Sequence, residues 1–169
     1  MEALDVLKTR RSIRKYTDEK ISEDKIKELL NCSMFAPSAF DTQPWQFIVI
    51  DKKEMFGDIL KVATHAEMIK GASHAIIICG DNKLQETRDL LIQDISAATQ
   101  NLLLAAHSLG LGAVWTGIYP FEEIVTGIRK LFNLPENILP VAMVVLGYPA
   151  EKPEQPVRYK EEKVHFNKW

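Results

Sequence analysis

The sequence predicts an α+β domain in which a small mixed or antiparallel sheet is flanked by helices. Four short apolar segments, rich in Ile, Val and Leu, have the length and composition of buried strands. Segments with apolar residues at helical spacing separate them, and the longest runs from residue 88 to residue 109. The chain of 169 residues shows no internal repeat and no domain boundary, so we expect a single domain over residues 1–169.

The expected helices and strands alternate along most of the chain. The second helix begins at Ser22, a good N-cap residue, and ends at Pro37, which cannot continue a helix. The expected helices are 2–9, 22–36, 53–63, 88–109 and 121–132, and the expected strands are 46–50, 75–80, 113–117 and 141–146.

The helix over 88–109 is apolar around an unusually large part of its circumference. Its polar residues recur in pairs seven positions apart, at 93–94, 100–101 and 107–108, and nearly all the others are Leu, Ile or Ala. A central core helix is one explanation. Partial burial against a second subunit explains the pattern better, because one face of a small sheet cannot cover so wide an apolar surface. Gly110 is expected to end the helix as a C-cap residue.

Residues 150–169 are expected to form a C-terminal arm. The arm begins with a stretch dominated by Pro, Glu, Lys and Gln, which can hardly fold on itself. It nevertheless ends with four residues that favour burial, namely Tyr159, Val164, Phe166 and Trp169. We therefore expect the arm to lie across another surface, either of this domain or of a partner subunit, with the partner subunit favoured.

Composition and charge predict a soluble globular protein and exclude several other classes. Hydrophobic residues make up 46% of the chain, and a net charge of −2 argues against nonspecific binding to nucleic acid. No apolar run approaches the roughly 20 residues that span a membrane. The N-terminus lacks the basic region of a secretion signal, so we expect a cytoplasmic protein with Cys32 and Cys79 reduced. The four histidines have no carboxylate or Cys at ligand spacing, so no metal site is expected.

Two segments near the N-terminus indicate a site for a flat, phosphorylated molecule. Residues 10–14, Arg-Arg-Ser-Ile-Arg, follow a short amphipathic helix and offer three guanidiniums and a hydroxyl to a phosphate. Residues 36–47, which include Ala-Pro-Ser and Gln-Pro-Trp-Gln-Phe, combine a rigid loop with a hydroxyl, an amide and a large aromatic side chain. The first segment alone is equally compatible with a solvated basic stretch at a helix end, whereas the pair is much more specific.

Together with a third segment, these motifs resemble the nitroreductase family of flavin mononucleotide (FMN) enzymes. The third segment is 110–117, Gly-Leu-Gly-Ala-Val-Trp-Thr-Gly, which matches the family's Gly-Leu-Gly-x-x-Trp-x-Gly pattern after a long Ala-rich helix. The motifs stand in the family's order, and Arg158 matches a further basic position near the C-terminus. One residue departs from the pattern, because Asp41 stands where the family usually has Asn.

The resemblance implies that Arg10, Ser12 and Arg158 bind the FMN phosphate. Arg14 matches the basic residue near the pyrimidine end of the flavin ring, where a positive charge would stabilise the anionic reduced ring. Arg11 matches a variable position. It is kept as a candidate ligand, although a surface charge is the preferred interpretation for it.

The resemblance also implies contacts to the flavin ring. The residues expected there are Pro37, Ser38 and Ala39 alongside the ring, Asp41 and Gln43 at its edge, and Thr116 and Gly117, whose backbone groups would lie near N5. An ionised Asp41 can only accept hydrogen bonds, and its charge would oppose an anionic reduced ring. The replacement of Asn by Asp therefore affects both this contact and the expected redox potential.

For the whole protein, the resemblance implies the FMN-dependent nitroreductase-like fold, as an intertwined homodimer with two FMN sites at its interface. Tightly but non-covalently bound FMN would carry the chemistry at N5, and no catalytic side chain is expected. NAD(P)H would reduce the flavin in a ping-pong mechanism, and a nitroaromatic, a quinone or a related small acceptor would reoxidise it. Two alternatives remain open: a reductive dehalogenase or flavin-fragmenting member of the same fold, and a non-catalytic flavin-binding or electron-carrier protein.

Overall fold

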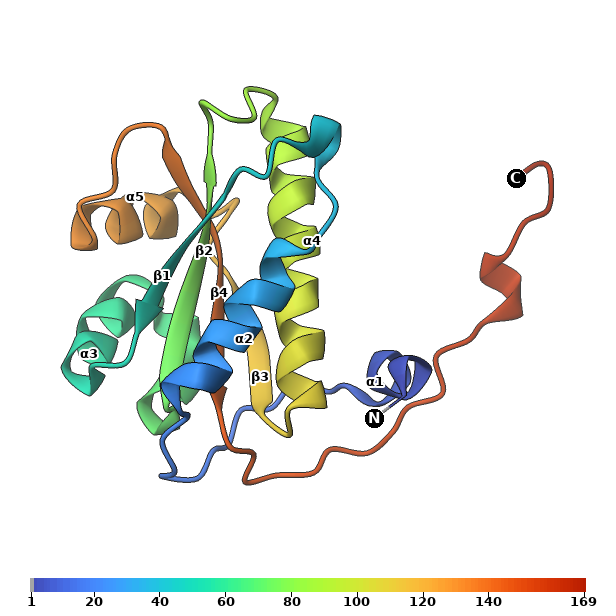
Figure 1. Ribbon diagram of the computed structural model, residues 1–169, viewed down its shortest axis with the longest axis horizontal. Coiled ribbons are helices and arrows are strands. Elements are labelled where there is room, and N and C mark those ends of the chain that lie inside the picture. The colour runs from blue at the N-terminus through green and yellow to red at the C-terminus, as the bar shows by residue number, and fades with distance from the viewer. Residues whose placement is uncertain (1) are drawn as a thin grey trace.

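The computed structural model describes residues 2–169. A four-stranded sheet lies at its centre, with strand order β1-β2-β4-β3 and every neighbouring pair antiparallel (Figure 1). Of the two arrangements that the sequence left open, the antiparallel one is therefore present. The strands are β1 (Trp45–Ile50), β2 (His74–Asp81), β3 (Gly112–Gly117) and β4 (Ile138–Gly147). All four lie where the sequence predicted strands.

The strand β4 differs most from its expected bounds, because it begins at Ile138 and not at 141. Pro140 lies inside this extension, and a proline normally argues against a central strand. The register between β2 and β4 shifts between Ile78 and Cys79, and Cys79 is paired with Pro140. A bulge of this kind accommodates a residue that cannot donate to the ladder.

Five α-helices among the described residues flank the sheet: α1 (Ala3–Thr9), α2 (Glu23–Met34), α3 (Lys53–Val62), α4 (Arg88–Ser108) and α5 (Glu122–Leu131). They confirm the five expected helices to within about two residues at each end. The helices α2 and α4 pack together on one side of the sheet, and α3 and α5 pack together on the other (Figure 1). Ser22 is the N-cap residue of α2, although its side chain makes no capping hydrogen bond.

The described part of the chain also contains three short 3₁₀ helices: η1 (Ala39–Asp41), η2 (Thr64–Gly71) and η3 (Glu161–Lys163). None of the three was expected from the sequence. Such segments lack the long apolar periodicity that distinguishes an α-helix or a strand in the sequence.

The helix α4 is the central element of the core. Its residues Leu91, Ile95 and Leu102 are completely buried, and it packs against α2 and all four strands. Other apolar residues of α4 are only half-buried, among them Ile92, Ala97 and Ala105. The chain itself therefore covers much of the apolar surface of α4, and burial of the remainder against a second subunit stays a prediction.

The end of α4 forms a Schellman turn. Gly110 adopts a left-handed conformation with φ of 75°, and its N–H donates to the carbonyl of His107 at 3.1 Å. The N–H of Leu111 donates to the carbonyl of Ala106 at 2.8 Å. Gly110 thus ends the helix as predicted, one residue after the C-cap Leu109.

The segment after α1 continues along the edge of the sheet. Ser12 forms an isolated parallel bridge with Ala113, and the N–H of Ile13 donates to the carbonyl of Ala113 at 3.0 Å. A Cβ at Gly112 would lie only 2.6 Å from the Ile13 side chain. The second glycine of Gly-Leu-Gly is therefore required for this close approach.

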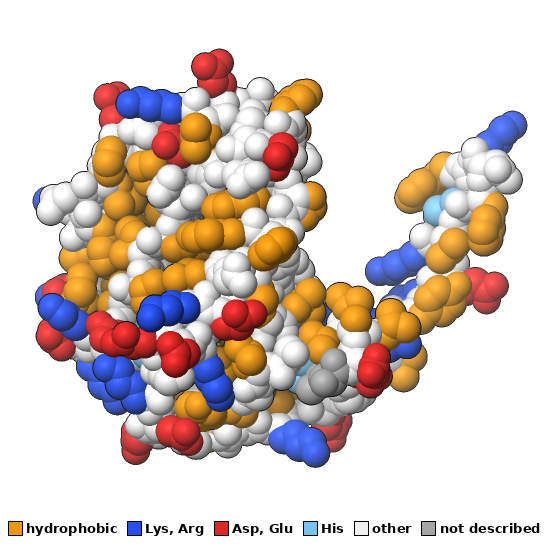
Figure 2. Space-filling view, in the orientation of Figure 1, with side chains coloured by type: hydrophobic (Ala, Val, Ile, Leu, Met, Phe, Trp, Pro, Cys, Tyr) orange, Lys and Arg blue, Asp and Glu red, His pale blue; other side chains and the backbone are white. Residues whose placement is uncertain are grey.

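The C-terminal arm begins against the domain and then leaves it. Ala150 donates to the carbonyl of Lys15 at 2.9 Å, and Glu151 accepts hydrogen bonds from the N–H groups of Arg14 and Lys15. The end of the arm extends into open space in Figure 1, and apolar side chains are visible along it in Figure 2. Phe166 is 83% exposed and Trp169 is fully exposed.

Candidate functional site

A basic cluster, defined here as Arg10, Arg11 and Arg158, forms where the end of α1 meets the arm. These arginines line one hollow together with residues of both segments. Burial lowers the pKa of Arg10, and the charges of Arg158 and Arg11 lower it further. The ion pairs found between residues 2 and 169 all involve lysine. Three like charges held together, with no ion-pair partner among residues 2–169, are the arrangement expected for an anion site.

Arg11 differs from the other two arginines because its donors are directed to protein acceptors. Its guanidinium donates to the carbonyls of Lys8 and Glu154 and to the side chain of Gln155. Arg11 therefore joins the arm to the end of α1. These contacts give Arg11 a structural role, and its part in ligand binding stays a prediction.

Ser12 and Arg14 flank Ile13, whose N–H donates to the carbonyl of Ala113 in the sheet. Ser12 is half-buried beside Ala113, and the Arg14 side chain is exposed. The backbone N–H of Arg14 donates to Oε1 of Glu151 at 2.5 Å, so the arm fixes the backbone at this residue.

Thr116 and Gly117 end β3, which is an edge strand of the sheet. The Thr116 side chain is buried and donates to the carbonyl of Met143 at 3.0 Å. It is thus engaged within the protein, and a ligand would meet the backbone here. Beyond Ala113, the described residues place no strand along the outer edge of β3. Unpaired N–H and C=O groups at such an edge are available to a polar ring.

The loop over residues 37–43 is held in an unusual conformation. Phe40, Asp41 and Gln43 have φ of 56°, 55° and 47°, which is uncommon for residues other than glycine. The N–H of Gln43 donates to Oγ of Ser38 at 3.0 Å, and Nε2 of Gln43 donates to Oδ1 of Asp41 at 2.9 Å. The carboxylate of Asp41 thus already accepts a hydrogen bond, and its side chain remains exposed.

A buried carboxylate supports this loop from α4. Oδ1 of Asp94 accepts the N–H of Ala39 at 2.8 Å, and Oδ2 has no hydrogen-bond partner. This supporting role of Asp94 was not predicted from the sequence. The sequence signal for it is a polar residue within an otherwise apolar helix. That signal entered the prediction only as one of the recurring polar pairs, 93–94.

The candidate residues fall into two sets that are far apart in the chain. The 37–43 loop contacts Asp94 in the second turn of α4, whereas the basic cluster lies near His107 in its last turn. These two helix positions are thirteen residues apart, or about 20 Å at 1.5 Å per residue. In Figure 1 the loop lies at one end of α4 and α1 at the other. The candidate residues of one chain therefore lie in two separate places.

Comparison with known proteins supports the family resemblance of the sequence motifs. A family model described as "Nitroreductase family" matches residues 7–75 and 59–148 in two overlapping segments. A Methanothermobacter thermautotrophicus protein named "Putative NADH dehydrogenase/NAD(P)H nitroreductase" is 48% identical over 169 residues, which cover all of this chain and 88% of the relative. The chain belongs to the nitroreductase family.

Solved structures of nitroreductases share the fold over nearly the whole chain. An "FMN-dependent Nitroreductase" from Clostridium difficile R20291 superposes with a TM-score of 0.90 at 31% identity, and covers 98% of this chain and 99% of its own. A Desulfovibrio desulfuricans structure, a "putative nitroreductase in complex with fmn", superposes with a TM-score of 0.85 at 30% identity. It covers 98% of this chain and 96% of its own. The nitroreductase-like α+β fold predicted from the motifs is therefore confirmed.

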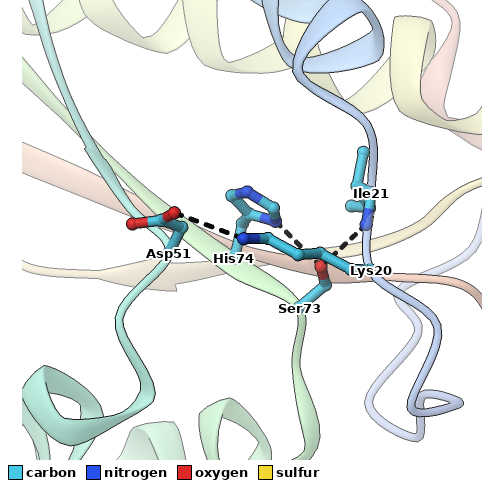
Figure 3. Close-up of polar contacts among 5 residues, drawn as sticks. All are labelled: Lys20, Ile21, Asp51, Ser73 and His74. Carbon is cyan, nitrogen blue, oxygen red and sulfur yellow. Dashed lines mark hydrogen bonds and ion pairs between the residues drawn. The ribbon is translucent and has the colours of Figure 1, made fainter.

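A second polar cluster in this nitroreductase-family chain, drawn in Figure 3, contains none of the candidate residues. Ser73 Oγ accepts the N–H of Ile21 at 2.9 Å and lies 2.8 Å from Nδ1 of His74. Lys20 and Asp51 form an exposed ion pair beside them, 3.5 Å apart. Ser73 and His74 are both buried, and the hydroxyl of Ser73 is engaged by Ile21 and His74. The hydrogen bonds of this cluster hold the segment before α2 against the start of β2.

Two features are absent from residues 2–169. No three His, Cys, Asp or Glu side chains gather closely enough to hold a metal ion. No helix combines the length and the apolar character that crossing a membrane requires.

Proposed function

We propose that this chain is an FMN-dependent oxidoreductase that passes electrons from NAD(P)H to a small oxidised acceptor such as a nitroaromatic or a quinone. The observation that carries the proposal is the basic cluster, in which arginines converge and make no ion pair within residues 2–169. Membership of the nitroreductase family supports it. The names of the relatives include both NAD(P)H and FMN.

The basic cluster and the adjacent Ser12 fit the phosphate end of FMN. Arg10 and Arg158 supply charge-assisted donors and Ser12 a hydroxyl, which together suit a phosphate dianion. The open edge of β3 leads from this cluster to Thr116 and Gly117, where backbone groups would meet the ring. Arg14 would place a positive charge near the ring and favour its anionic reduced form.

When bound, FMN supplies the hydride-accepting and hydride-donating chemistry. The residues of this chain would bind the cofactor, orient it and set its electrostatic environment. The 37–43 loop fits the ring edge, because Asp41 and Gln43 offer both acceptors and donors on a rigid backbone.

In this proposal, a homodimer brings the basic cluster and the 37–43 loop together in one FMN site. The basic cluster of one subunit would face the 37–43 loop of its partner, since the two sets are about 20 Å apart along α4 within one chain. The exposed apolar end of the arm supports this arrangement, because such side chains favour burial. A groove between α1, α2 and α4, lined by Leu7, Phe35 and Leu104 among others, offers an apolar surface for the partner subunit.

The experiment that tests the function uses the purified protein in two steps. Its absorption spectrum should show the bands of oxidised flavin, and NADH or NADPH should bleach them without oxygen. Addition of a nitroaromatic or a quinone should then restore the bands and support steady-state oxidation of the nicotinamide. A colourless protein that binds no added FMN would overturn the proposal. Bleaching that no acceptor reverses would indicate a flavin protein without this turnover.

A further inference from the structure

We propose that His107 is a positioning residue for the phosphate anchor, which holds Arg10 in place through a hydrogen bond to Thr9. The inference rests on the proposed function, because it assigns a role at the same FMN site. It concerns a residue in the last turn of α4 that none of the sequence motifs contains.

The hydrogen bond has a defined direction. Nε2 of His107 lies 2.8 Å from Oγ1 of Thr9, and the Thr9 hydroxyl donates to the carbonyl of Asp5 at 2.6 Å. A hydroxyl has a single proton to donate, so Thr9 accepts from the ring. The proton of the neutral imidazole is thereby assigned to Nε2, and Nδ1 carries none.

The helix α1 needs such an anchor. It has seven residues and a single buried one, Val6, and isolated helices of this length are not stable in water. Thr9 is its last residue, and Arg10 follows as the C-cap. A bond from Thr9 to the long central helix therefore fixes the backbone from which the Arg10 side chain extends.

Like charges in the cluster make the anchor more important. Arg10, Arg11 and Arg158 repel one another when no anion is bound, which favours separation of the arm from α1. The carbonyl of Thr9 also accepts Nε2 of Gln155 at 3.2 Å, and Gln155 accepts from Arg11. Thr9 is thus the point at which α4, α1 and the arm are joined.

The surroundings of His107 favour its neutral form. Burial lowers its pKa, and the charges of Arg10 and Arg11 on the adjoining segment lower it further. Two residues of the arm, Glu151 and Lys152, line the same cavity as His107, and they carry opposite charges. A neutral ring can hold Thr9 without adding a fourth cation to the cluster.

The test compares FMN with riboflavin, which lacks the phosphate. Dilution of the flavin-loaded protein, followed by the fluorescence of released flavin, gives the dissociation constant of FMN. Exchange by dialysis gives the same measurement for riboflavin. His107→Ala and Thr9→Val should each weaken FMN about 3- to 10-fold, the effect of one hydrogen bond, and change riboflavin less than twofold. The double variant should be no weaker than either single one, because both remove the same contact.

Conservative variants and a matched histidine serve as controls. His107→Gln and Thr9→Ser can still form the bond, so both should retain FMN within about twofold of the wild type. His65→Ala, at an exposed site in η2, should have no effect.

Two results would overturn the inference, and they are distinguishable. If the wild type prefers FMN over riboflavin and His107→Ala keeps the full preference, the positioning role is wrong and the proposed function stands. If the wild type binds the two flavins equally, both the phosphate site and the role of His107 are wrong.

Discussion

The buried carboxylate of Asp94 accepts the backbone N–H of Ala39, with 2.8 Å between Oδ1 and the nitrogen. This bond joins the 37–43 loop to the second turn of α4, which is the most deeply buried helix of the fold. Because three loop residues have positive φ, the loop needs contacts that fix it in this conformation. Asp94 is 5% exposed and supplies one of them.

Replacement of Asp94 by Ala should destabilise both the protein and this loop. The N–H of Ala39 would lose its partner, at a cost of about 1–3 kcal/mol in the free energy of unfolding. Urea unfolding measures the loss, and hydrogen exchange over residues 37–43 should become faster. Gln93→Ala is the matched control, since Gln93 is the exposed neighbour on the same helix. An Asp94→Ala protein that behaves like this control would refute the supporting role.

The phosphate anchor predicts a selective loss of FMN. Arg10→Ala or Arg158→Ala should weaken FMN binding by roughly 1.5–3 kcal/mol, the range for a hydrogen bond to a charged group. Riboflavin should bind almost as before. Arg88→Ala, an exposed arginine at the start of α4, should change neither ligand. An equal loss of FMN and riboflavin would mean that the two arginines act elsewhere.

Asp41 is expected to tune the redox potential of the flavin. A carboxylate beside the ring opposes the negative charge of the reduced form, so Asp41→Asn should raise the midpoint potential and tighten binding of reduced flavin. Asn can still accept from Nε2 of Gln43, which keeps the local hydrogen bond. Potentiometric titration of both proteins checks this. An unchanged potential would show that the carboxylate is directed away from the ring or is already neutralised.

His74 predicts a loss of stability in acid. Burial lowers its pKa, while Asp51 raises it and Lys20 lowers it to smaller extents. The unfolded chain therefore takes up a proton near pH 6.5, before the folded protein does. The contribution of His74 to stability is complete above that pH and is lost as the pH falls below it.

The measurement for His74 is the free energy of unfolding as a function of pH. The wild type should lose stability below pH 6.5 more steeply than His74→Asn, which keeps a hydrogen-bonding group beside Ser73. His65→Asn, at an exposed histidine, should follow the wild type. Parallel curves for the wild type and His74→Asn would contradict the assignment.

The elements of the fold were predictable because each carries a regular apolar pattern. The strand β2 reads as a continuous apolar run, and it is buried on both faces because helices cover both sides of the sheet. The early start of β4 was not predictable, since Pro140 is acceptable there only through a bulge in the pairing with β2. Which strands pair, and in which direction, depends on contacts that no local pattern records.

The candidate residues were predictable from motifs, but their arrangement in space was not. The motifs do not reveal that residues 10–14 and 37–43 lie at opposite ends of α4. The supporting residues Asp94, His107 and Gln155 were also missed as parts of the site. Their hydrogen-bond partners are 55, 98 and 146 positions away in the sequence.

The central claim is that one FMN site combines the basic cluster of one subunit with the 37–43 loop of its partner. A heterodimer tests it most directly. One subunit would carry Arg10→Ala and Arg158→Ala, and the other Asp41→Ala and Gln43→Ala, each with its own affinity tag. Each homodimer should bind FMN weakly, because both of its sites are damaged.

In the co-expressed heterodimer, the intact cluster of the second subunit would meet the intact loop of the first. Our account predicts one tightly bound FMN per heterodimer, measured from flavin absorbance after purification through both tags. The remaining site would carry all four substitutions and stay empty. A heterodimer that retains no more FMN than either variant homodimer would contradict a site shared between subunits.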